Sequence, residues 1–173
     1  MKQATDQMFD IREEQPSDAA AIREVNESAF AGAHEADIVD ALRANGAVLL
    51  SLVATIRDRV VGHLLYSPAV IGDIEGAALG PLAVRPEYQR KGIGSKLVEA
   101  GNARLAADGC PFVILIGHPE YYPRFGFRRA IDFGIRCEWD IRDEVFMVWF
   151  PSPNTIGTIA GLAKYRPEFS SVE

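Results

Sequence analysis

Hydrophobic and polar positions divide the chain into short apolar or alternating stretches and longer stretches with a helical period. The short stretches are rich in β-branched residues and predict strands at 8–14, 48–56, 60–67, a run ending at Val84, 112–116 and 144–150. In the longer ones, apolar residues recur every three or four positions, which predicts helices at 17–30, 34–45 and 94–107. The pattern predicts an α/β domain with helices laid on a sheet.

Local signals mark the ends of the helices. Ser17, after Pro16, is the expected N-cap of the first helix, and Gly46 is the natural stop of the second. In the third helix Gly101 falls on the apolar stripe, where the missing side chain would let the helix lie close to the sheet.

Strand order follows from the connections. Residues 48–67 predict an antiparallel hairpin, and the glycine-bearing turn 72–76 leads into the strand that ends at Val84. The segment 112–116 is apolar throughout, as a strand covered on both faces must be, and it follows a long helix. We therefore expect a crossover that makes it parallel to the strand ending at Val84. A glycine stop at Gly126 should end a helical turn begun by Pro119.

Composition narrows the class of protein. With 173 residues, of which 48% are hydrophobic and 24% charged, the chain can close one ordinary core. A net charge of −6 argues against a general nucleic-acid binder and permits a cationic substrate. Cys110 and Cys137 form no CxxC pair, no Cys/His spacing suggests a metal site, and no apolar run is long enough for a membrane helix. A cytoplasmic protein without a metal is the expectation.

Residues 79–107 carry the main candidate chemistry. A strand ends before Arg85 and Pro86, and Gln89–Gly94 then places two glycines at a helix start. The first N–H groups of a helix have no intrahelical partner and lie at the positive end of its dipole, so they bind anions. Arg90, Lys91 and Lys96 add full charges. This combination predicts a ligand that carries phosphate.

Three other interpretations of the glycines compete with this one. A P-loop needs GxxxxGK[ST], which is absent. The dinucleotide fingerprint needs a third glycine where Leu97 stands and a tight turn from strand to helix, but Pro86 and its neighbours intervene. A helix that simply starts with glycine after a loop explains the QxxGxG pattern about as well as a function does.

The order of motifs decides between them, because the chain resembles the GNAT superfamily of acetyl-CoA-dependent N-acetyltransferases. In that family a strand–Q/RxxGxG/A–helix unit binds the coenzyme and a Tyr-x-x-x-Gly-Phe motif follows the next strand. Both occur here in order, as Gln89–Gly94 and Tyr122–Phe127. The residues around Tyr122 and in the tail 165–169 resemble those of a group of small bacterial GNAT proteins.

The resemblance implies a mixed, mostly antiparallel sheet of six to seven strands with a splayed central parallel pair and helices on both faces. It assigns residues 9–151 to the acetyltransferase domain and 152–173 to a C-terminal extension packed on it. Acetyl-CoA would be the co-substrate, with its pantetheine arm along the backbone of Leu82, Ala83 and Val84. The pyrophosphate would lie on the main chain from Gln89 to Ser95. Backbone and cations together give one set of coenzyme-binding residues: Leu82, Ala83, Val84, Gln89, Arg90, Lys91, Gly92, Ile93, Gly94, Ser95 and Lys96.

Two catalytic roles carry over by position. Tyr122 matches the family's general acid, and a phenol of pKa about 10 can protonate a thiolate only within hydrogen-bond reach. Its other interpretation is an aromatic packing residue beside Tyr121. The main-chain N–H of Leu82 or Ala83 is the expected oxyanion donor. Many family members carry an asparagine near 117–120, which this chain lacks, so that pantetheine contact is lost or replaced.

The general base and the acceptor stay open at this point. Candidate bases are Glu24, Glu27, His34, Glu75, His118 and Glu120, and each alone is also explained as a solvated surface group. His63 lies within a strand and is expected to be a satisfied core or rim histidine.

The predicted activity is acetyl transfer to a primary amine, of a small molecule or a peptide, by direct attack. The alternative is a non-catalytic acyl-CoA sensor or interaction module on the same fold. Neither a nucleic acid nor a membrane is an expected partner, and a homodimer, common in the superfamily, is not visible in the sequence.

Overall fold

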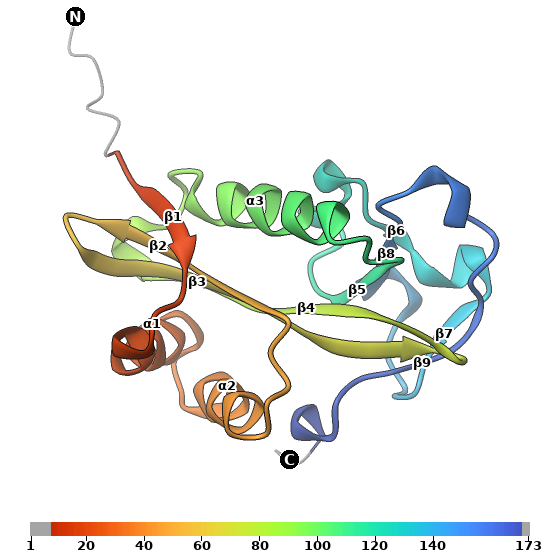
Figure 1. Ribbon diagram of the computed structural model, residues 1–173, viewed down its shortest axis with the longest axis horizontal. Coiled ribbons are helices and arrows are strands. Elements are labelled where there is room, and N and C mark those ends of the chain that lie inside the picture. The colour runs from red at the N-terminus through yellow and green to blue at the C-terminus, as the bar shows by residue number, and fades with distance from the viewer. Residues whose placement is uncertain (1–7, 171–173) are drawn as a thin grey trace, which may run out of the picture.

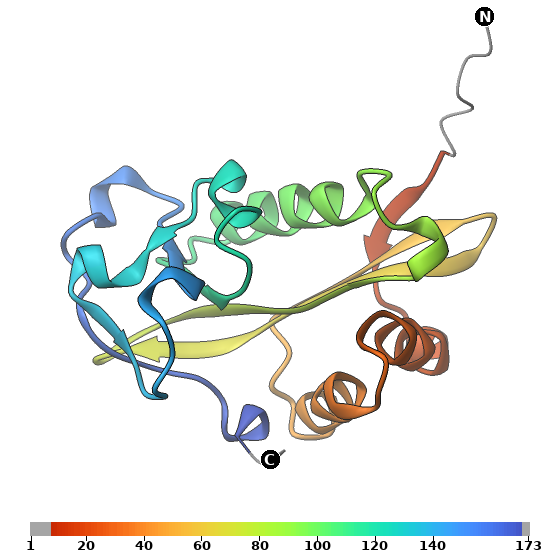
Figure 2. The same cartoon turned by 180° about the vertical axis from the view of Figure 1, so that it is seen from behind.

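The computed structural model describes residues 8–170, which form one twisted sheet with helices on both faces. Figures 1 and 2 show α3 on one face of the sheet and α1 and α2 on the other. The helices are α1 (Ala19–Phe30), α2 (His34–Ala44) and α3 (Ile93–Ala107). The strands are β1 (Asp10–Glu13), β2 (Leu50–Ile56), β3 (Arg59–Ile71), β4 (Ile74–Val84), β5 (Val113–Ile116), β6 (Arg128–Arg129), β7 (Ile135–Cys137), β8 (Phe146–Trp149) and β9 (Gly161–Lys164).

The strand order confirms the expected topology. Seven strands follow one path, β1-β2-β3-β4-β5-β8-β6, and the neighbours along it are antiparallel except for β4 and β5, which are parallel. β9 pairs with the far end of β3, at Val70 and Ile71, and β7 pairs with β9, which makes nine strands in the described part of the chain. The tail after residue 151 thus contributes a strand to the sheet, whereas the division of the chain at that residue stays a prediction.

Three local predictions were wrong. Ser17 does not cap α1: the Gln15 N–H donates to Asp18 Oδ2 at 2.7 Å, and Asp18 is the N-cap residue. The turn expected at 72–76 is shorter, because β4 already begins at Ile74. The helical turn expected from Pro119 begins at Tyr122 and ends at Gly126, whose φ of 91° is the left-handed conformation that glycine adopts freely.

The close approach of α3 to the sheet depends on Gly101. A Cβ at Gly101 would lie 2.4 Å from the hydroxyl oxygen of Tyr66, which is fully buried on β3. That hydroxyl donates to Asn102 Oδ1 at 2.8 Å. The main apolar cluster lies beneath this helix and includes Leu97, Val98 and Leu105. Packing at this distance fixes the start of α3 relative to β4.

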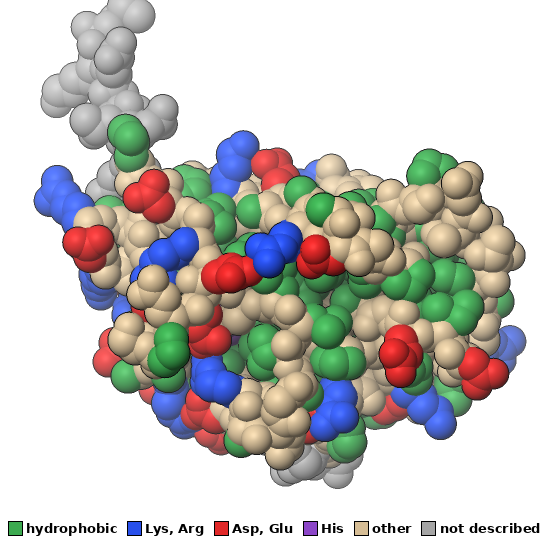
Figure 3. Space-filling model, in the orientation of Figure 1, with side chains coloured by type: hydrophobic (Ala, Val, Ile, Leu, Met, Phe, Trp, Pro, Cys, Tyr) green, Lys and Arg blue, Asp and Glu red, His purple; other side chains and the backbone are tan. Residues whose placement is uncertain are grey.

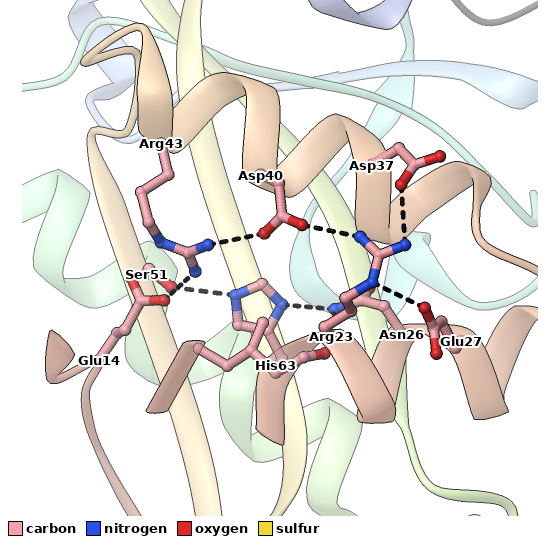
Figure 4. Close-up of polar contacts among 10 residues, drawn as sticks. Glu14, Arg23, Asn26, Glu27, Asp37, Asp40, Arg43, Ser51 and His63 are labelled. Atoms are coloured by element: carbon pink, nitrogen blue, oxygen red, sulfur yellow. Dashed lines mark hydrogen bonds and ion pairs between the residues drawn. The ribbon is translucent and has the colours of Figure 1, made fainter. Parts of the chain in front are cut away.

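A buried polar group joins α1 to the opposite face of the sheet. His63, on β3, is fully buried, and its ring nitrogens lie 3.0 Å from Ser51 Oγ and 3.1 Å from Asn26 Nδ2 (Figure 4). This confirms the expectation of a satisfied core histidine. Burial lowers the pKa of His63 to about 3, with a smaller effect from the charge of Arg43. The imidazole is therefore neutral at physiological pH.

The surface differs from one end of the molecule to the other. On the face in Figure 3, charged side chains gather over β1 and the first helices, and hydrophobic ones are more frequent toward the opposite end. Within residues 8–170, no helix is long and apolar enough to cross a membrane. In the same range no group of three or more His, Cys, Asp or Glu side chains could hold a metal ion.

His63 gives a stability prediction for acid solution. Below its ordinary pKa of 6.5 the unfolded chain takes up a proton at His63, whereas the folded chain does so only near pH 3. The stabilisation contributed by neutral His63 is fully present above pH 6.5. It is lost as the pH falls toward 3, with a slope in the free energy of unfolding on the order of 1 kcal/mol per pH unit. The free energy of unfolding, measured with urea between pH 7 and 4.5, should therefore fall less steeply with decreasing pH for His63→Gln than for the wild type.

The matched control is His34→Gln, because His34 is exposed at the start of α2. Its stability should follow the wild-type pH dependence. Equal slopes for His63→Gln and the wild type would contradict a buried neutral imidazole.

Candidate active site

The central parallel pair separates soon after it forms. β4 and β5 are in register only at Ala77 with Val113 and Ala78 with Ile114. Farther along, β4 pairs with β3 alone and the end of β5 pairs with β8. The open edge of β4 borders a cavity of about 1140 Å³. Because an unpaired strand edge carries free N–H and C=O groups, this cavity offers hydrogen bonds to an extended ligand.

The backbone of β4 alternates between its two edges. The Arg85 N–H donates to Val61 O of β3 at 2.9 Å, whereas Val84 O accepts from Gln89 Nε2 at 2.9 Å on the other side. Alternation along the strand therefore directs the N–H groups of Leu82 and Val84 to the open edge and that of Ala83 to β3. The Ala83 side chain is buried against α1 and α2. Of the two expected oxyanion donors, this orientation favours Leu82.

The segment between β4 and α3 turns sharply at the mouth of the cavity. A 3-10 turn at Pro86–Tyr88 comes first, and Arg90 and Gly92 then have φ of 62° and 85°. The first intrahelical hydrogen bond of α3 runs from the Lys96 N–H to the Gly92 carbonyl oxygen, at 3.1 Å. The N–H groups of residues 93–95 precede it and are the free donors of the helix start. Gly92, Ile93, Gly94 and Ser95 all line the cavity.

The three expected phosphate cations lie in different surroundings. Arg90 lines the cavity. Lys91 and Lys96 are absent from its lining: Lys91 Nζ lies 5.6 Å from the centre of the Tyr88 ring, and Lys96 is paired with Glu99 at 3.2 Å. The structure therefore brings together Leu82, Val84, Gln89, Arg90, the helix start and Tyr122, but not the side chains of Ala83, Lys91 and Lys96.

Tyr122 follows β5 by six residues, and its ring lies against Gly117, the residue after that strand. It begins the 3-10 turn Tyr122–Phe125 and lines the cavity. Its ring contacts Tyr121 edge-on, with centroids 5.0 Å apart, and Phe127 at 5.9 Å. Burial raises the pKa of Tyr122 to about 12, so the phenol is protonated at physiological pH. Tyr121 instead places its hydroxyl 3.1 Å from Ser95 Oγ.

The candidate bases separate into two groups. His34 and His118 line the cavity, whereas Glu24, Glu27, Glu75 and Glu120 do not. Glu24 and Glu27 are paired with Arg85 and Arg23, at 3.3 and 2.8 Å. Glu75 lines a second cavity of about 760 Å³ at the other end of β4. The site thus retains two of the six candidates.

Several lining residues were missed from the sequence. Arg124 lies against the Tyr121 ring, with its guanidinium carbon 4.5 Å from the ring centre. Glu35 lines the cavity one residue after the candidate His34. Four aromatic residues to which the sequence assigned no role in the site also line the cavity: Phe30, Trp139, Tyr165 and Phe169. An acidic residue in the first turn of a helix was the one available signal, for Glu35.

The tail is held beside α2 by a buried carboxylate. Figures 1 and 2 both show the C-terminal turn next to this helix. Glu168 is 6% exposed, accepts from Arg166 Nη2 at 2.7 Å and accepts from Asn45 Nδ2 at 3.0 Å. The Arg166 guanidinium, with help from Asn45, lowers the pKa of Glu168 to about 2. These bonds fix Tyr165 and Phe169 as part of the cavity wall.

A mixed sheet that opens between two parallel strands, beside a glycine-bearing helix start, defines a GNAT-like acetyltransferase fold. The model of the acetyltransferase (GNAT) domain matches residues 48–129. The N-acetyltransferase YhbS of Escherichia coli strain K12 is 32% identical over 92% of this chain and 98% of its own length. YjhQ of the same strain is 39% identical over 77% of each chain.

Solved structures agree with these matches. The crystal structure of Escherichia coli YhbS in complex with CoA has a TM-score of 0.92 at 31% identity, and the match covers 95% of this chain and 93% of the other. A GNAT acetyltransferase of Brucella melitensis in complex with acetyl-CoA has a TM-score of 0.80 at 37% identity, with 94% and 99% covered. This chain belongs to the GNAT family of N-acetyltransferases.

The position of Tyr122 can be tested through Gly117. A Cβ at Gly117 would lie 2.5 Å from Cε2 of Tyr122, so Gly117→Ala must displace the ring. Such overpacking costs about 1–3 kcal/mol, which should lower the melting temperature by roughly 2–12 °C. Thermal unfolding measures this shift. In the control, Gly32→Ala, the new Cβ has nothing within 4 Å and should change little; equal effects of the two would argue against this contact.

Proposed function

We propose that this protein transfers the acetyl group of acetyl-CoA to a primary amine by direct attack, with the coenzyme in the cavity between β4 and β5. The observation that carries the proposal is the open edge of β4, which ends beside the start of α3 and opposite Tyr122. The two relatives with CoA and acetyl-CoA bound support the choice of ligand.

The coenzyme is held mainly by backbone. The pantetheine amides extend the sheet by bonding to the Leu82 C=O and the Val84 N–H at the open edge of β4, since Val84 O already accepts from Gln89. The pyrophosphate lies on the N–H groups of residues 93–95, where the helix dipole favours negative charge. Arg90, which lines the cavity, and Arg124, against Tyr121, supply full charges. Lys91 and Lys96 lie outside the cavity and attract the coenzyme phosphates only by longer-range electrostatics.

The chemistry needs one donor for oxygen and one for sulfur. A neutral amine attacks the thioester carbonyl, and the Leu82 N–H at the open edge stabilises the oxyanion that forms. The attack forms the C–N bond, and collapse of the intermediate restores the carbonyl and breaks the C–S bond. The amine loses one proton and the departing CoA sulfur gains one. His34 and His118 line the cavity and are the remaining candidates from the sequence for removing the amine proton.

Tyr122 donates a hydrogen bond to the departing CoA sulfur. Its pKa of about 12 keeps the phenol protonated throughout the physiological range, so a donor is always present. An ordinary thiol has a pKa of about 8.5, which makes full transfer from the phenol unfavourable. Tyr122 therefore acts first by hydrogen bonding to the developing thiolate, and complete protonation follows as CoA leaves.

The test of the proposal is Tyr122→Phe. Loss of the donor should lower kcat by about 10²- to 10⁴-fold and leave the Kd of acetyl-CoA within about twofold, because the ring and the backbone contacts remain. The assay follows release of free thiol from acetyl-CoA with a panel of amines, and calorimetry follows coenzyme binding. Tyr66→Phe is the control, since it removes a buried phenol outside the cavity.

The outcomes separate the alternatives. Unchanged turnover in Tyr122→Phe would remove Tyr122 as the donor and keep the transferase. Binding of acetyl-CoA without thiol release for any amine would instead favour a non-catalytic acyl-CoA sensor. A failure to bind acetyl-CoA at all would overturn the whole proposal.

A further inference from the structure

One wall of the cavity is built from aromatic side chains that the proposed chemistry does not use. Trp139 and Tyr165 are stacked, with ring centres 4.9 Å apart and planes inclined by 24°. Tyr165 in turn contacts Phe169 edge-on at 5.5 Å. Phe30, at the end of α1, lines the same cavity and is 40% exposed. We call Phe30, Trp139, Tyr165 and Phe169 the aromatic wall.

The aromatic wall is assembled from three distant parts of the sequence. Phe30 belongs to α1, Trp139 follows β7, and Tyr165 and Phe169 come from the tail. The Glu168 contacts with Arg166 and Asn45 tie the tail to the end of α2. A wall held in this way is preorganised, so a flat apolar ligand can pack on it at a small cost in ordering side chains.

A carboxylate that has no arginine as ion-pair partner lines the same cavity. The neighbouring acids of α2 are neutralised: Arg23 binds Asp37 at 2.9 Å and Asp40 at 2.7 Å (Figure 4). Glu35 also belongs to the first turns of α2, but it lines the cavity and has no ion pair within residues 8–170. Its charge is available to a cation that enters the cavity.

The walls favour a small ligand over the surface of a folded protein. Enclosure by α1, α2, the loop after β7 and the tail suits a molecule that fits among aromatic rings, as small-molecule pockets do. The coenzyme groups of the proposed site, Leu82, Gln89 and the start of α3, belong to other segments, so both ligands have contacts of their own.

We propose that the aromatic wall and Glu35 form the acceptor site, and that the acceptor is an arylalkylamine bound as its ammonium ion. The aromatic group packs on Trp139, Tyr165 and Phe169, and the Glu35 carboxylate attracts the ammonium. This inference names the acceptor class and rests on the proposed function for its chemistry. The binding site itself is independent of turnover.

Binding to the protein saturated with CoA tests the site without catalysis. Calorimetry should find that 2-phenylethylamine binds at least tenfold more tightly than n-hexylamine, which lacks the ring, and 2-phenylethanol, which lacks the charge. Spermidine and an alanine tripeptide test polyamine and peptide acceptors. Equal or tighter binding of any of these four compounds would overturn the inference.

Variants assign the contacts. Glu35→Gln should weaken 2-phenylethylamine binding about tenfold, because it removes one charge-assisted contact. Asp37→Asn is the control: Asp37 is on the same helix but outside the cavity, so this variant should leave binding unchanged. Trp139→Leu and Phe169→Leu should each weaken it roughly three- to tenfold. Phe133→Leu is their control, since Phe133 packs on Phe150 outside the cavity.

The readouts distinguish this inference from the proposed function. CoA affinity should be the same in all five variants, and melting temperatures identify any that fail to fold. Glu35 is only half-buried, so Glu35→Gln keeps the test sound if an aromatic variant unfolds. Tight, Glu35-dependent binding without acetyl transfer would refute the transferase and keep the site. Acetyl transfer to other amines, unaffected by these variants, would refute the site and keep the transferase.

Discussion

The structure depends on the hydrogen bonds that β4 and β5 do not make. The two strands are parallel neighbours at Ala77 and Ala78 and then separate, so one edge of β4 stays open inside the fold. The N–H and C=O groups of such an edge need a ligand or water as partner. The packing of α3 through Gly101 and of the chain after β5 through Tyr122 keeps the edge open. The same feature that costs backbone hydrogen bonds supplies the site.

Much of the coenzyme side could be predicted from the sequence because its signals are local. Gln89–Gly94 marks a helix start, and the apolar run 112–116 marks a buried parallel strand. Whether the N–H of Leu82 or of Ala83 faces the cavity could not be decided, since that depends on the register with β3. Ser17 was wrong as a cap because a 3-10 turn at Pro16–Asp18 precedes α1 and places Ser17 inside it.

The acceptor side could not be predicted because it has no contiguous motif. Trp139, Tyr165 and Phe30 line one cavity only after β9 joins the sheet and the Glu168 contacts hold the tail. Glu35 and Asp37 are alike in sequence, and only the fold pairs one with Arg23 and directs the other to the cavity. Three short strands were missed. β6 and β7 are only two and three residues long, and β9 lies in a tail broken by proline and glycine.

The most direct test of the central claim is a titration of the ¹⁵N-labelled protein with CoA, followed through its backbone amide resonances. The largest shifts are expected at Leu82 and at residues 93–95, with a smaller shift at Ala83, whose N–H faces β3. Shifts that cluster instead around the second cavity, at Glu75, Cys110 and Lys164, would contradict it.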